Sequence, residues 1–281
     1  MNRFGQGACA LAVAVAIALA GCGKDEARGP AGADAQTPAD AAPGEQAPAA
    51  AADAGLQDVI DTTPRYVVGI SYPPAANAHP GLARALAEYA EHARAELLKA
   101  VDELGNDKPT APYELSLAFD MVVDTPQVVA VAAEGSTYTG GAHGQPLVAR
   151  FVWLPVQQRM LTVQALVDSS KGWQAVSEYV GDKLLEQAMV RAQSQEMTPE
   201  EQQDQVRNLS RMIAEGSAPE AANFAQFQPV MDAAGRIAAL RFVFPPYQVG
   251  PYSDGTQTVD VPAAVVLPYV ADDYRELFAG A

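Results

Sequence analysis

Three short stretches of the sequence carry side chains that could bind a ligand or take part in chemistry. The first is a glycine-rich stretch, Tyr138-Thr-Gly-Gly-Ala-His143, which includes Gly141. The second is a proline-bearing stretch that contains Tyr247 and Tyr252. The third, Leu19-Ala20-Gly21-Cys22, places a cysteine directly after small residues near the N-terminus. These stretches define the candidate site residues.

His143 is the most suggestive single residue among them. Glycines around it let the backbone approach a ligand closely and adopt positive φ. The imidazole could contact a ligand, or it could act as an acid or a base. It could equally form a hydrogen bond that fixes its own loop, and the sequence leaves both roles open. Tyr138 and Gly141 belong to the same candidate surface.

Tyr247 and Tyr252 stand beside prolines in a loop that also contains glycine. Such a loop presents a rigid, partly apolar edge that suits ligand binding. The alternative is that both rings only pack the loop onto a sheet. We expect this loop and the His143 loop to lie near each other and to form one ligand-binding surface.

The sequence gives little support for metal, cofactor or nucleophile chemistry. The three histidines, His79, His92 and His143, show no zinc-binding spacing, so we expect neither a metal nor a cofactor. No Gly-x-Ser-x-Gly elbow is present. The acidic pairs Glu200-Glu201 and Asp272-Asp273 are expected on helix surfaces. Carboxylates brought together only by folding could still form a hydrolase site, so that alternative stays open.

The N-terminus has the features of a lipoprotein signal peptide. Arg3 precedes an uncharged apolar run, Ala8 to Leu19, which is too short to cross a bilayer that needs roughly 20 residues. We therefore expect cleavage after Gly21 and lipidation of Cys22, which would anchor the protein in the membrane. Gly23 favours the periplasmic face of the outer membrane as its location.

The charge balance is strongly acidic, with a formal net charge of -16 over 281 residues. Nucleic acid is an unsuitable partner for such a surface, because its phosphates require basic residues. A cationic protein would be steered toward it. Solubility alone is the simpler explanation of the charge.

The patterning predicts an α+β fold with mixed or antiparallel sheets and packed helices, after a disordered N-terminal tether rich in Ala and Pro. Apolar residues alternate in the strands and recur at three- or four-residue spacing in the helices. Strands are expected at residues 65–72, 113–121, 128–133, 147–154, 224–230, 237–244 and 258–261. Helices are expected at 82–104 and 161–167, and from residues 173, 198 and 262 onward.

Several stretches together resemble a known family. Tyr138-Thr-Gly-Gly-Ala-His143, Trp153-Leu154-Pro155 and the segment from Phe242 to Gly255 occur in the order seen in the domain of unknown function shared with the ectodomain of the anti-sigma-V factor RsiV. The part from Tyr66 to about Thr125 resembles the PdaC-type domain that often precedes it.

The resemblance implies a domain plan and a function. We expect a signal peptide at 1–21, a lipidated linker at 22–56, a PdaC-type domain at 57–125 and an RsiV-like domain at 126–281. The best-understood branch of the family binds lysozyme, so we expect a binding or sensing module for an envelope protein or a wall-related ligand, with a cationic protein such as lysozyme as candidate partner. A wall-modifying hydrolase is the alternative.

Overall fold

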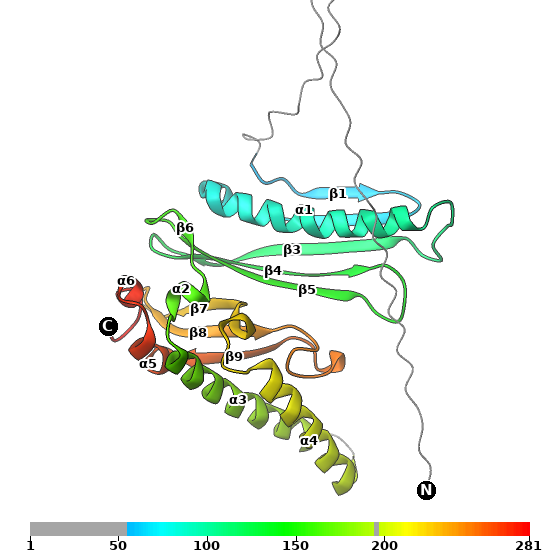
Figure 1. The fold of residues 1–281 in the computed structure, drawn as a ribbon. Coiled ribbons are helices and arrows are strands. Elements are labelled where there is room, and N and C mark those ends of the chain that lie inside the picture. Colours follow the sequence, from blue (N-terminus) through cyan, green and yellow to red (C-terminus); the bar gives the residue numbers. More distant parts are fainter. Residues whose placement is uncertain (1–54, 194–196) are drawn as a thin grey trace, which may run out of the picture. The chain divides into compact units, whose positions relative to one another are not determined.

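A six-stranded sheet forms the first half of the fold. In the computed structural model, which describes residues 55–193 and 197–281, its strands follow each other in chain order (Figure 1). Every neighbouring pair is antiparallel except β2 and β3, which run parallel. The strands are β1 (Val59–Thr62), β2 (Tyr66–Ser71), β3 (Tyr113–Asp124), β4 (Val129–Tyr138), β5 (Gln145–Leu154) and β6 (Arg159–Met160).

Helix α1 (Pro80–Glu103), which follows the short 3-10 helix η1 (Pro74–Ala78), makes the crossover between the two parallel strands. A parallel connection needs a crossover of this length, because a tight turn would reverse the chain. The buried side of α1 includes Leu86 and Leu97, which pack on one face of the sheet. Burial beside α1 also raises the pKa of Tyr72 to about 12.

A three-stranded antiparallel sheet forms the second half, in the order β7 (Phe227–Met231), β8 (Ile237–Phe244) and β9 (Gln257–Pro262). Its helices are α2 (Val163–Leu166), α3 (Ser170–Gln193), α4 (Pro199–Gly216), α5 (Ala263–Val266) and α6 (Asp272–Arg275). Three 3-10 helices complete it: η2 (Ala221–Phe224), η3 (Tyr252–Asp254) and η4 (Leu267–Tyr269). The long helix α3 packs its apolar stripe into the core, where Trp173 stacks on Phe224 with 5.5 Å between ring centroids.

Strand β4 contributes to two hydrophobic cores. Val129 and Val131 point toward α1, whereas Ala130 lies in the core that also contains Phe227 and Phe242 of the second sheet. Side chains alternate across a strand, so a strand covered on both faces needs an unbroken apolar run. The first five residues of β4 are all buried, as this arrangement requires.

Arg150 of β5 connects the first sheet to the second. Strand β6 pairs with β5 only at Trp153 and Leu154, so the preceding part of β5 has an edge that β6 does not cover. There the backbone N–H of Arg150 donates to Gln226 Oε1 at 2.7 Å, and its Nε donates to Gln228 Oε1 at 2.8 Å. Side-chain amides adjoining and within β7 therefore bond to the edge of β5.

The guanidinium of Arg150 also bonds to the neighbouring strand β4. Its side chain is 5% exposed. Its Nη2 lies 2.5 Å from Glu134 Oε1, and Nη1 donates to the carbonyl oxygens of Ala133 and Ala149. A buried guanidinium is tolerated only when its donors are satisfied, and these partners supply the acceptors.

The α+β class is confirmed, and most predicted elements match observed ones. One local prediction is wrong. Phe224 lies in η2 and not in a strand, because the strand begins only at Phe227. The helix expected from Pro262 onward does begin there, as the four-residue α5, which passes directly into η4. The third predicted helix does start after Thr198, with the expected capping box to Glu201.

The predicted division of the chain stays a prediction. Its boundary at residues 125 and 126 falls in the turn between β3 and β4, inside the six-stranded sheet. The signal peptide, Cys22 and nearly all of the predicted tether lie outside the described residues. Within the described part of the chain, no helix is long and apolar enough to span a bilayer.

Replacing Arg150 with Met should lower the free energy of unfolding by about 2 kcal/mol, because Gln228 and backbone carbonyls lose a buried donor. The matched control is Arg241→Met, since the Arg241–Asp260 pair is about 40% exposed and such pairs contribute about 1 kcal/mol or less. Urea unfolding monitored by circular dichroism measures both. Equal losses in the two variants would contradict the role given to Arg150.

A candidate binding surface of histidine and tyrosine side chains

The tip of the β4–β5 hairpin carries the glycine-rich stretch. Gly140 and Gly141 have φ values of 97° and 99°, which L-residues with a side chain rarely adopt. A Cβ added at either glycine would meet nothing within 4 Å, so the space beside them is open. Tyr138 Oη donates to the carbonyl oxygen of Gly141 at 3.2 Å, which folds the tyrosine back over the loop.

The loop between β8 and β9 carries Tyr247 and Tyr252, and Gln248 anchors it to the protein. The side chain of Gln248 donates to the carbonyl oxygens of Gly216 at 2.9 Å and Asn223 at 2.8 Å. The next residue, Val249, is buried. These contacts fix the loop to the ends of α4 and η2, so Gln248 and Val249 point inward and Tyr247 lies outside.

Tyr247 is held in an unfavourable backbone conformation. Its φ is 74°, and it is 52% exposed. A non-glycine residue in this region costs roughly 1–2 kcal/mol. The conformation persists because Gln248 is anchored and because the Tyr247 N–H donates to the Gly250 carbonyl at 3.0 Å. Aromatic residues with positive φ are uncommon, and such strain concentrates at functional sites.

The two loops meet, although their residues are far apart in the sequence. Tyr247 Oη lies 3.1 Å from His143 Nε2, across a separation of 104 residues. The ring of His143 stacks on that of Tyr252, with centroids 4.0 Å apart and planes 16° apart. The rings of Tyr247 and Tyr252 have centroids 5.7 Å apart. We call Tyr138, His143, Tyr247 and Tyr252 the His–Tyr cluster. The expected proximity of the two loops is confirmed by the contacts of His143 with Tyr247 and Tyr252.

Each ring nitrogen of His143 has a polar partner. Its Nδ1 lies 3.2 Å from the carbonyl oxygen of Gly144, which can only accept, so Nδ1 is the donor in that contact. Its Nε2 lies 3.1 Å from the hydroxyl oxygen of Tyr247, which can donate or accept.

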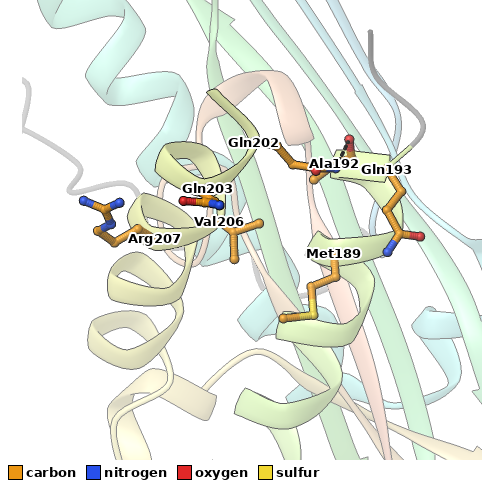
Figure 2. Close-up of a pocket in the computed structure, with 7 residues that line it drawn as sticks. All are labelled: Met189, Ala192, Gln193, Gln202, Gln203, Val206 and Arg207. Atoms are coloured by element: carbon orange, nitrogen blue, oxygen red, sulfur yellow. Dashed lines mark hydrogen bonds between the residues drawn. The ribbon is translucent and has the colours of Figure 1, made fainter. Parts of the chain in front are cut away.

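Two grooves lie away from the cluster. A groove of about 500 Å³ lies between the ends of α3 and α4, where Met189 and Val206 approach the same space (Figure 2). A second groove of about 480 Å³ follows the exposed side of α3 near Val190. Neither is lined by a residue of the His–Tyr cluster. The cluster is therefore part of an exposed surface and does not line either groove.

The titratable groups outside the His–Tyr cluster bear on metal binding and on raised pKa values. No group of three His, Cys, Asp or Glu side chains among the described residues could hold a metal ion. Tyrosines with a raised pKa lie in the first half of the fold: burial raises the pKa of Tyr89 in α1, and a hydrogen bond to Asp61 raises the pKa of Tyr66 in β2. Their shifts follow from packing in the first half of the fold.

Several residues that position the cluster were not identified from the sequence. Gln248 anchors the loop of Tyr247, and Asp254 connects η3 to α3 through an ion pair with Arg191 at 3.5 Å. Amides and surface ion pairs carry no sequence signal of their own, because many partners would satisfy them equally well. The sequence predicts a loop around Tyr247 but gives no sign of its positive φ.

The fold and this surface define an α+β protein of two sheets with an exposed aromatic surface where their loops meet. Two family models match the chain: "Deacetylase PdaC" at residues 61–145 and "Protein of unknown function (DUF3298)" at residues 174–264. The chain therefore contains a PdaC region followed by a DUF3298 region, as the resemblance implied, and this combination indicates an envelope-associated protein. A search of curated proteins gave no match.

Solved structures of DUF3298 family proteins are similar to the chain. One from Pseudomonas aeruginosa is 15% identical, with a TM-score of 0.49, and the alignment covers 82% of this chain and 99% of that one. Another from Bacteroides fragilis is 16% identical, with a TM-score of 0.41 and coverage of 72% of each chain.

The His–Tyr cluster takes residues from both matched regions. Tyr138 and His143 fall within residues 61–145, and Tyr247 and Tyr252 fall within residues 174–264. Neither region carries the whole surface. The hydrogen bonds of Arg150, which lies between the two matches, hold the regions together.

Tyr247→Gly should be more stable than Tyr247→Ala by about 1 kcal/mol, because both variants lose the ring and only glycine adopts φ near 74° without strain. Thermal and urea unfolding of the two variants measure the difference. If alanine were equal to or better than glycine, the backbone at this position would not be strained.

Proposed function

We propose that this chain is a lipid-anchored envelope protein that binds an envelope protein or a wall-related ligand through the His–Tyr cluster. Its role is recognition and not catalysis. The observation that carries the proposal is the strained, exposed Tyr247. Gln248 fixes its loop to the protein, and its hydroxyl contacts His143, whose ring stacks on Tyr252. A rigid surface loses little conformational entropy when it binds.

The chemistry of the cluster supports recognition. Its rings present both apolar faces and polar edges, a combination enriched at protein interfaces. A hydrolase would need acidic or nucleophilic groups converging in a cleft. Neither groove of about 500 Å³ includes a cluster residue, and the cluster itself contains no carboxylate.

The partner that best suits the charge of the chain is a cationic protein. The formal net charge of -16 attracts basic proteins and increases their rate of encounter. Lysozyme is such a protein, and the resemblance to the RsiV ectodomain motivates its choice as the first candidate.

Anchoring through Cys22 is tested by membrane fractionation. Wild-type protein should sediment with the outer membrane, whereas Cys22→Ala should be found in the soluble periplasmic fraction, because the thioether that carries the lipid cannot form. Metabolic labelling with a palmitate analogue provides a second readout. Labelled, membrane-bound Cys22→Ala protein would rule out this anchor.

Binding is tested by capture on immobilised lysozyme and on purified envelope proteins, with the full-length protein. His143→Ala combined with Tyr247→Ala should reduce capture at least about tenfold, if the cluster acts as an interface hot spot. The matched control is Ile60→Ala combined with Val156→Ala, which alters side chains that are 87% and 75% exposed outside the cluster.

The outcomes separate the two functions. Capture that is lost in the cluster variant and kept in the control supports the binding surface. Equal capture by both variants places binding elsewhere. No capture by any form contradicts a lysozyme-binding role, and peptidoglycan hydrolysis by the wild-type protein would then favour an enzyme.

A further inference from the structure

We propose that the group recognised by the His–Tyr cluster is the planar guanidinium of an arginine side chain on a basic protein partner. This inference rests on the proposed function and specifies the contact that the partner makes. It follows from the ring geometry, the hydrogen bonds already formed within the cluster, and the charge of the chain.

The rings offer a stacking surface for a flat cation. Tyr252 covers one face of His143 at 4.0 Å, and His143 is itself exposed. The ring of Tyr247, tilted by 39° to His143 and 38° to Tyr252, stands at its side. Guanidinium groups stack on aromatic faces and are drawn to them electrostatically, whereas an ammonium group lacks a planar face.

The hydrogen-bonding capacity of the cluster favours a ligand that only donates. The hydroxyl of Tyr138 donates to the carbonyl oxygen of Gly141, and the hydroxyl of Tyr247 is paired with Nε2 of His143. Both hydroxyl oxygens keep lone pairs that can accept, as do the carbonyl oxygens of the glycine-rich loop. A guanidinium has five donors and no acceptor. A sugar also needs donors for its oxygens, and two of the three tyrosine hydroxyls are already engaged in hydrogen bonds with Gly141 and His143.

Charge and access favour the same ligand. The cluster contains no Lys or Arg, so it has no permanently charged basic side chain that would repel a guanidinium. Arg191, which contacts this loop from α3, is itself paired with Asp254 and Gln257. The open space at Gly140 and Gly141 leaves room for an approaching side chain.

The test compares three short peptides, tetra-arginine, tetra-lysine and tetra-citrulline, titrated into the full-length protein. Citrulline is planar and nearly the same size as arginine but neutral. Tetra-arginine should bind roughly two- to fivefold more tightly than tetra-lysine, and tetra-citrulline should bind most weakly. Calorimetry gives the affinities. The chain has three histidines, so imidazole resonances report binding at His143 directly.

Variants of Tyr247 and Tyr252 locate the effect. Tyr252→Leu should abolish the preference for arginine over lysine while leaving their common electrostatic attraction. Tyr247→Phe keeps the ring and should keep the preference for tetra-arginine over tetra-lysine. A preserved preference in this variant shows that a substitution in the cluster does not by itself unfold the binding surface. Ile60→Ala serves as the surface control, and thermal unfolding checks each variant.

Equal affinities for tetra-arginine and tetra-lysine would overturn the inference, as would an arginine preference that survives in Tyr252→Leu. A chito-oligosaccharide that shifts the His143 resonance more strongly than tetra-arginine would also overturn it, and would leave the cluster as a binding surface for a glycan. Loss of lysozyme capture with an intact arginine preference would instead count against the partner proposed above, and not against the guanidinium contact.

Discussion

The hydrogen bonds of Arg150 determine how the two halves of this fold relate to each other. A guanidinium that is almost completely buried has to find acceptors, and it finds them on β4, on β5 itself and on Gln228 of β7. The acceptor on β7 is available to the Nε–H group only because the edge of β5 lies against β7. The position of the β4–β5 hairpin, which carries His143 at its tip, depends on that arrangement.

The candidate site therefore depends on how the two sheets pack, and no single motif contains it. The β4–β5 hairpin carries His143, and the β8–β9 loop of the other sheet carries Tyr247 and Tyr252. Gln248 keeps that loop in place even though Tyr247 has an unfavourable φ. The unfavourable backbone conformation of Tyr247 is offset by the partly buried hydrogen bonds of Gln248, and such compensation maintains a strained residue at a surface.

The sequence predicted those parts of the structure that local patterns determine. Buried apolar residues such as Leu82, Leu86 and Leu97 belong to the three- and four-residue spacing that predicts α1. Thr198 with Glu201 predicts the start of α4. Phe224 was misassigned, because a short apolar run does not distinguish a strand from a buried 3-10 turn. The proximity of His143 and Tyr247 could be predicted only as a hypothesis, since Arg150 and Gln248, whose bonds create it, have side chains that could pair in many ways.

The double burial of β4 also bears on how the protein unfolds. Val129 and Val131 belong to one core and Ala130 belongs to the other, so melting this strand removes side chains from both at once. Neither half can lose its structure while the other keeps a complete interior. Although two family regions can be recognised along the chain, they should behave in denaturation as a single cooperative unit, and no proteolytic cut between them should release two independently stable fragments.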